Sequence, residues 1–371
     1  MTSRILVLLL LGYSLSGISW ASTLPPQTLP LQPTPHVQVT PARPLKFPNA
    51  LGSHPQFPLE WWYVTGHLQS AEGSRLGFQL TFFRLRPPKV WANPSAFNPS
   101  QIYFAQAAIS DPQIGHLLTA QQASTGSLGL AGASKDQTDV WLGHWRLQQL
   151  GSTYLAQVQG QQFSFQLQLQ PTQPALLEGP LGVSQKGPNP HNASYYYSIP
   201  QLRVRGNLQI HSRTMKVHGS AWLDHEWSKA YLPKNAVGWD WLGINLKDGG
   251  ALMLFQMRNK EQQPLWLAGT WRHANGQVQY LHGSEIRWQA LHHWRSPSTG
   301  IRYPIRWQIE IPGLRFVIEP LMQDQEFQAQ ESTGNTYWEG AVDIRERGKS
   351  LGSGYLELTG YGGQLQMGSG G

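Results

Sequence analysis

Carboxylic acids flanked by tryptophan are the strongest chemical signal in this sequence. One cluster, at residues 222–227, holds Asp224, His225 and Glu226, and another holds Asp240 between two tryptophans. A carboxyl group surrounded by apolar rings has a raised pKa, so it can keep a proton near neutral pH and deliver it to a substrate. We therefore predict Glu226, Asp224 or Asp240 as a general acid, and His225 as the group that orients it or relays the proton.

The tryptophans around these acids predict an aromatic wall. The chain contains 16 Trp, and aromatic faces stabilise positive charge without being nucleophiles, which suits a reaction that builds a cation in an apolar substrate. The candidate ligand contacts are Trp61, Trp62, Trp227, Trp239 and Trp241. A purely structural interpretation is the alternative: the rings would close the ends of barrels, and the carboxylates would bond to indole or backbone N–H groups.

Strand periodicity limits which of these side chains can meet. Successive residues of a β-strand point to opposite faces, so Trp239 and Trp241 share a face that Asp240 does not. Likewise Trp62 opposes Trp61. From spacing alone, the acids and the aromatic wall need not face one cavity.

The elements that position these residues are predicted to be short antiparallel strands. Apolar and polar residues alternate over 163–170, which indicates a half-buried strand. Turn signals at 247–250, 275–276 and 312–313 separate apolar runs and predict three hairpins. Only 13% of residues are charged, and no sustained helical period occurs. These features predict an all-β chain.

The predicted organisation is a leader, a linker and two domains. Residues 1–21 combine Arg4, an apolar run and small residues before a cleavage site, which predicts a signal peptide and a periplasmic or secreted protein. The Pro-rich stretch 22–48 predicts an extended linker. The remaining length predicts an N-terminal domain at 49–230 and a C-terminal domain at 231–366.

Composition excludes or disfavours several function classes. The chain has no Cys, so disulfides, thiolate metal sites and Cys nucleophiles are excluded. Its 13 His include no His-x-x-x-His spacing, so we predict no metal site and no cofactor. No Gly-x-Ser-x-Gly elbow is present. The net charge of +7 comes from scattered residues, which argues against nucleic-acid binding.

At these same motifs the sequence resembles the carotenoid 1,2-hydratase (hydroxyneurosporene synthase) superfamily, and more closely its secreted AttH-like branch. The matching segments are 59–68, 221–228, 238–241, 337–340 and 354–361. The resemblance implies two consecutive lipocalin-like antiparallel β-barrels and an ABC-type permease system as a partner. In the hydratase branch it implies addition of water to an acyclic carotenoid.

The resemblance also carries over to single residues. The His and Trp of the hydratases' Asp-His-x-Trp motif fall on His225 and Trp227. The Tyr and Asp that the hydratases use on a following strand align with Phe255 and Met257, which cannot donate a proton. Asp240 or Glu226 would have to substitute for them.

Three functions remain open from the sequence. The first is a carrier or sensor that binds an apolar small molecule, a lipid or isoprenoid, inside a barrel. The second is an acid-catalysed hydratase, and the third is an interaction protein whose barrels are filled by side chains. The first predicts tolerance of Glu226→Gln, whereas the second predicts loss of turnover.

Overall fold

The computed structural model describes residues 38–87, 101–229 and 232–365. All of them fall in the compact unit that spans His36–Gly371. The predicted signal peptide and the first part of the predicted linker lie outside the described residues. The end of that linker is described, and its Val39 and Leu45 pack against the first core. Within the described ranges, no helix has the length and apolar character needed to cross a membrane.

An antiparallel sheet of 13 strands occupies the first part of the chain, in the order β4-β3-β2-β1-β13-β12-β9-β8-β7-β6-β5, with β10 and β11 paired to β12. Its strands are β1 (Leu59–Ser70), β2 (Arg75–Leu85), β3 (Ile102–Ser110), β4 (Leu117–Thr125), β5 (Ala131–Ala133), β6 (Asp139–Leu142), β7 (Trp145–Leu150), β8 (Thr153–Gln159), β9 (Phe163–Gln170), β10 (Leu176–Leu177), β11 (Val183–Gln185), β12 (Ala193–Ile210) and β13 (Arg213–Ser228).

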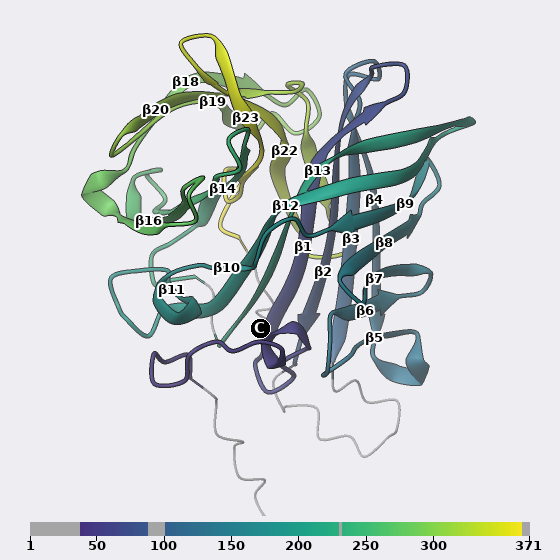
Figure 1. Ribbon diagram of the computed structural model, residues 1–371, viewed down its shortest axis with the longest axis horizontal. Helices are drawn as coiled ribbons and strands as arrows, with labels where there is room; N and C mark the ends of the chain where they lie inside the picture. The colour runs from purple at the N-terminus through teal and green to yellow at the C-terminus, as the bar shows by residue number, and fades with distance from the viewer. Residues whose placement is uncertain (1–37, 88–100, 230–231, 366–371) are drawn as a thin grey trace, which may run out of the picture. The chain divides into compact units, whose positions relative to one another are not determined.

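A second antiparallel sheet, of 10 strands, follows in the order β17-β16-β15-β14-β23-β22-β20-β19-β18, with β21 paired to β22. It curls into a nearly closed barrel (Figure 1). Its strands are β14 (Gly238–Leu246), β15 (Ala251–Arg258), β16 (Pro264–Arg272), β17 (Val278–His282), β18 (Arg287–Arg295), β19 (Arg302–Ile311), β20 (Leu314–Pro320), β21 (Glu326–Ala329), β22 (Asn335–Glu346) and β23 (Lys349–Leu358).

The predicted all-β class is confirmed. The described residues contain only strands, turns and four short 3-10 helices, at Asn49–Leu51, Ser127–Gly129, Pro180–Gly182 and Gly283–Glu285. The three predicted hairpins are present as β14–β15, β16–β17 and β19–β20. The break between the sheets falls between Ser228 and Gly238.

Each sheet has its own apolar core, and a third core lies between the sheets. This third core combines side chains of β1 and β13, such as Trp61, Tyr63 and Trp222, with side chains of the second sheet, such as Trp241 and Met253. It forms because the central strands carry apolar residues on both faces, whereas an outward face that met water would be polar. The two sheets therefore share buried surface.

The sheets approach closely where β2 passes β22. A Cβ atom built on Gly77 would lie 2.7 Å from the Cβ atom of Ala341. Two polar contacts span the same junction: Ser110 Oγ donates to Gln325 Oε1 at 2.6 Å, and His67 Nε2 lies 3.0 Å from the carbonyl oxygen of Gly354.

Candidate functional site

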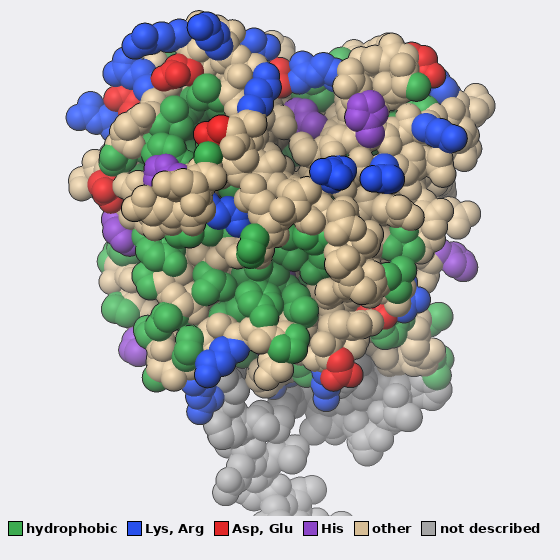
Figure 2. Space-filling view, in the orientation of Figure 1, with side chains coloured by type: hydrophobic (Ala, Val, Ile, Leu, Met, Phe, Trp, Pro, Cys, Tyr) green, Lys and Arg blue, Asp and Glu red, His purple; other side chains and the backbone are tan. Residues whose placement is uncertain are grey.

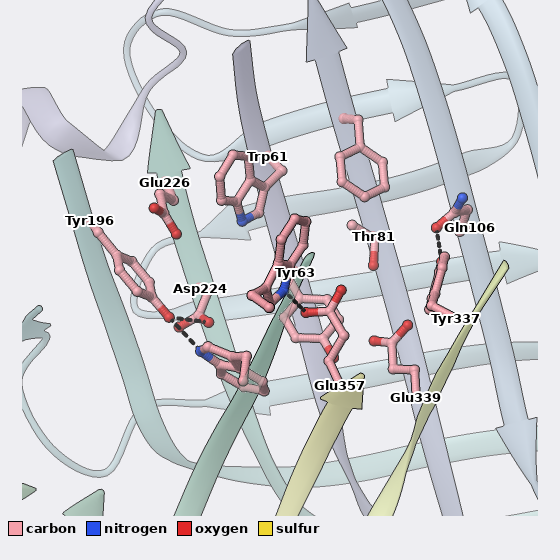
Figure 3. A pocket seen from close by; sticks show the side chains of 13 residues that line it. Trp61, Tyr63, Thr81, Gln106, Tyr196, Asp224, Glu226, Tyr337, Glu339 and Glu357 are labelled. Carbon is pink, nitrogen blue, oxygen red and sulfur yellow. Dashed lines mark hydrogen bonds between the residues drawn. The ribbon is translucent and has the colours of Figure 1, made fainter. Parts of the chain in front are cut away.

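A partly open cavity of about 40 Å³ lies in the third core, between the two sheets. Since one water needs roughly 10–15 Å³ measured in this way, the cavity admits about three waters or one end of a larger molecule. Figure 3 shows side chains from both sheets converging on it. The lining residues are Trp61, Tyr63, Thr81, Phe83, Gln106, Tyr196, Asp224, Glu226, Trp239, Trp241, Tyr337, Glu339 and Glu357.

Strand alternation explains which predicted residues reach the cavity. On β13, Asp224 and Glu226 line it, whereas Leu223 and Trp227 lie in the core of the first sheet. From β14, Trp239 and Trp241 complete the aromatic wall. The acids and this wall do meet, because β13 and β14 belong to different sheets that face each other, which periodicity along one strand cannot show.

Asp224 is held in place by hydrogen bonds on both of its oxygens. Tyr196 donates to Oδ2 at 2.5 Å, and the indole N–H of Trp222 donates to Oδ1 at 2.6 Å. Trp241 in turn donates to the Tyr196 hydroxyl at 3.0 Å. Burial nevertheless raises the pKa of Asp224 to about 7, although these hydrogen bonds lower it.

Ser198 links Asp224 to a second buried acid behind the cavity. Its Oγ atom lies 2.6 Å from Asp224 Oδ1 and 2.7 Å from Glu178 Oε1. A hydroxyl group has one proton, so it can donate to only one of the two carboxyl groups. The other short contact therefore requires a protonated carboxyl. Burial raises the pKa of Glu178 to about 8 and that of Asp224 to about 7, so the two acids together hold a proton near neutral pH.

Glu226 is the acid of the cavity with a cationic partner. Lys186 Nζ lies 2.9 Å from Glu226 Oε1, and Ser194 Oγ donates to the same oxygen at 2.5 Å. Burial raises the pKa of Glu226, and the charge of Lys186 partly offsets this effect. Lys186 Nζ also lies 4.4 Å from the centre of the Phe255 ring.

Glu339 and Glu357 form a carboxyl pair on the opposite wall. They are directly opposed on β22 and β23, and Trp239 donates to Glu357 Oε2 at 3.0 Å. Burial raises the pKa of Glu357 to about 7, with repulsion from other acids adding to the shift. For Glu339, burial and the charge of Glu357 raise the pKa well above its usual value. The pair therefore holds at least one proton near neutral pH.

Tyr63 and Glu339 form a buried polar pair on this wall. A side-chain hydrogen bond from Tyr63 lowers the pKa of Glu339 against the effect of burial, although the Tyr63 hydroxyl and Glu339 Oε1 make no hydrogen bond of good geometry with any described residue. A water molecule or a substrate that bonds to either atom would improve on this contact.

His225, Trp62 and Trp227 lie on the other face of the first sheet and do not line the cavity. His225 Nε2 is 2.9 Å from Glu60 Oε1, and its ring stacks on Trp62 with centroids 4.8 Å apart. Trp227 stacks on His54 with centroids 3.6 Å apart. Burial lowers the pKa of His225 to about 4, so the ring is neutral.

The cluster around Glu60 has the residue types of a metal site. The ligand atoms of His54, Glu60 and His225 lie within 4.8 Å of one another. Arg84 Nε already donates to Glu60 Oε2 at 2.8 Å and supplies the compensating charge. The two His–Glu contacts are 2.9 Å, whereas donors of a tetrahedral zinc ion are roughly 3.3 Å apart. The cluster thus has the geometry of a hydrogen-bonded support.

Asp240 points into the second barrel, as strand alternation predicts. Arg258 Nε donates to its carboxylate at 3.0 Å, and Gln256 and Tyr361 donate to it as well. Burial raises the pKa of Asp240, and the charge of Arg258 opposes the shift. The structure therefore separates Asp240 from Asp224 and Glu226.

Several residues of the site are absent from the sequence-based candidates: the lining residues Glu339, Glu357, Tyr63 and Tyr196, and Lys186, which contacts Glu226. A signal was present for three of them, because Tyr63, Glu339 and Glu357 lie inside the family-like segments 59–68, 337–340 and 354–361. Lys186 contacts Glu226 and Tyr196 donates to Asp224. These contacts join segments that are distant in the sequence, so no local sequence pattern indicates them.

Comparisons with known proteins agree with this architecture. Residues 38–361 match a family model described as AttH-like. The crystal structure of a Nitrosomonas europaea protein described as AttH superposes with a TM-score of 0.82 at 40% identity, covering 88% of this chain and 99% of that one. Kievitone hydratase from Nectria haematococca superposes with a TM-score of 0.63 at 16% identity, covering 84% and 90%, and shares the fold. No curated protein matches by sequence.

Proposed function

We propose that this chain, which belongs to the AttH-like family, is a hydratase that protonates a carbon–carbon double bond of an apolar substrate and adds water to it. The observation that carries the proposal is the composition of the cavity between the sheets. Four carboxyl groups, of Asp224, Glu226, Glu339 and Glu357, line it together with three tryptophans. No Lys, Arg or His is among its described lining residues.

Of the four carboxyl groups, only that of Glu226 contacts an ammonium group, that of Lys186, so the four cannot all be ionised near neutral pH. Repulsion between neighbouring carboxylates and loss of hydration both favour the protonated form. The Glu339–Glu357 pair is the best acid, because Glu357 is partly exposed at the cavity and titrates at about 7. A pKa near the working pH is what general acid catalysis requires.

The proposed reaction uses the two walls in sequence. The proton of the Glu339–Glu357 pair bonds to one alkene carbon, and the electrons of the double bond form the new C–H bond. The adjacent carbon becomes a cation, which the faces of Trp61, Trp239 and Trp241 stabilise. Water attacks this carbon and loses a proton to Asp224. Exchange with solvent restores the first proton, so the net change is alkene plus water to alcohol.

The volume of the cavity restricts the substrate. About 40 Å³ accommodates a water molecule and the branched end of an isoprenoid chain, while the rest of the substrate must lie outside. A branched alkene also gives the more stable tertiary cation. Kievitone hydratase shares the fold, so kievitone and an acyclic carotenoid are the two probe substrates of choice.

The test is mass spectrometry of organic extracts after incubation of the purified protein with each probe. We expect a product heavier by one water, and a loss of at least about 100-fold in Glu357→Gln or Glu339→Gln, since general acids typically contribute 10²–10⁴-fold. Glu346→Gln, on the same strand β22 but outside the cavity, is the matched control and should retain full activity.

Two results would contradict the proposal. One is turnover that survives in the Glu339→Gln, Glu357→Gln double variant. The other is recovery of an isoprenoid of unchanged mass from native protein together with no product from either probe, which would favour a carrier.

A further inference from the structure

A second and larger cavity opens inside the second barrel. Its volume is about 500 Å³, within the 300–1,000 Å³ range of small-molecule sites. Side chains of β15, β16, β18 and β19 surround it, and its apolar surface comes from Pro264, Leu267, Ile286, Ala290 and Pro304. It is distinct from the hydratase cavity, because no residue lines both.

The polar groups on its wall include two hydrogen-bond donors without partners. Trp307 lines the cavity and is only 5% exposed, yet its indole N–H has no partner among the described residues. Trp288 also lines the cavity, and its indole N–H likewise has no hydrogen-bond partner among the described residues. An indole nitrogen can only donate, so these groups are suited to a ligand that brings a hydrogen-bond acceptor.

The inner end of the cavity carries a compensated ion pair. Arg258 lines it, binds Asp240 at 3.0 Å, and stacks on Tyr361 with its guanidinium carbon 3.9 Å from the ring centre. This charge is neutralised within the barrel, so the inner end does not select for a charged ligand.

The rim, in contrast, carries uncompensated positive charge. Arg302 lines the opening, and Arg295 is its cross-strand neighbour. His293 lines it too, but burial and the charge of Arg302 lower the pKa of its ring, so the positive charge comes from the arginines. None of the salt bridges of the described residues involves Arg302 or Arg295. Figure 2 shows Lys and Arg side chains along the upper edge of the molecule, where the β22–β23 hairpin lies in Figure 1. Facing like charges are unfavourable, and an anion would relieve them.

We propose that the second barrel binds an anionic amphiphile: an aliphatic chain enters between Leu267, Ala290 and Trp307, and its carboxylate binds Arg302 at the rim. Apolar walls, unpartnered donors and a cationic opening match the three parts of such a molecule. This second site goes beyond the proposed hydratase and does not depend on it.

The test is calorimetric titration of the full-length protein with dodecanoate below its micellar concentration, and with dodecan-1-ol as the uncharged probe. We expect saturable binding of one dodecanoate per chain and weaker binding of the alcohol. Arg302→Gln should weaken dodecanoate about tenfold, the loss of one charge-assisted contact. Ala290→Trp, which fills the cavity, should abolish binding.

Arg306→Gln is the matched control, because Arg306 lies on the same strand but pairs with Glu319 outside the cavity. It should bind dodecanoate like the parent, as should Glu357→Gln. Absence of saturable binding, or unchanged affinity in Ala290→Trp, would overturn the proposal. Loss of binding in Glu357→Gln would place the ligand between the sheets and overturn it too. If Ala290→Trp fails to fold, the exposed Arg302→Gln variant decides.

Discussion

Protonation of single carboxyl groups is the property on which the candidate site depends. Asp224 and Glu357 each titrate at about 7, because burial disfavours their charged forms. Glu60, which is fully buried, behaves in the opposite way. Burial alone would raise its pKa, but hydrogen bonds from His225 and His54 and the charge of Arg84 lower it. The same residue type is thus a proton donor on one face of the first sheet and a permanent anion on the other.

From the raised pKa of Glu357 we predict how the free energy of unfolding changes with pH. In the unfolded chain this group titrates near 4.5, and in the folded chain at about 7. Between these values the folded state binds more protons, so the free energy of unfolding falls as the pH rises from about 4.5 through 7. Glu357→Gln removes this penalty and should stabilise the protein at pH 8 by on the order of 2 kcal/mol, with little effect at pH 4.

Urea unfolding of both proteins at the two pH values measures this difference. The control variant Glu346→Gln, outside the cavity on the same strand, should show the parent's pH dependence. A gain in Glu357→Gln that is equal at both pH values would show that folding does not raise the pKa of Glu357, and would remove it as the acid.

At the scale of strands, alternation divides the motifs between separate environments. The 222–227 segment of β13 sends Asp224 and Glu226 to the cavity and His225 and Trp227 to the core of the first sheet. On β14, Trp239 and Trp241 face the cavity while Asp240 faces the second barrel. One motif therefore supplies both cavity residues and residues that pack behind them. Substitutions at cavity positions should change activity, whereas substitutions at the adjacent positions should change the stability of the fold.

The contact between β2 and β22 gives a prediction at this scale. Gly77→Val places a side chain where Ala341 already lies, since even a Cβ atom would be 2.7 Å from the Ala341 methyl group. Overpacking of this kind costs roughly 1–3 kcal/mol. Gly283→Val, at a site with no neighbouring atom within 4 Å, is the control in thermal unfolding. Equal losses in the two variants would mean that the sheets adjust without strain.

For the described molecule as a whole, the shared core couples the two sheets. Trp61 and Trp222 of the first sheet pack with Trp241 and Met253 of the second, so neither sheet can unfold without exposing apolar surface of the other. We predict a single unfolding transition, with coincident curves from tryptophan fluorescence and far-UV circular dichroism. Two resolved transitions in calorimetry would show that each sheet is stable alone.

The sequence by itself determined the all-β class, several strands, three hairpins and which neighbours on a strand oppose each other. Alternation over 163–170 and the turns at 247–250, 275–276 and 312–313 are local signals, and local sterics and turn chemistry suffice to interpret them. The motifs also indicated the family. Asp240 could be separated from Trp239 and Trp241 for the same reason, since neighbours on a strand oppose each other.

Only the tertiary structure decided which acids share a cavity. Asp224 and Glu339 are far apart in the sequence, and they meet because two sheets pack face to face across a core that no local period describes. Their pKa values depend on burial and on neighbouring charges, which exist only in the folded chain. The existence and size of the cavity in the second barrel likewise depend on how far the curled sheet closes. This closure is a property of all its strands together.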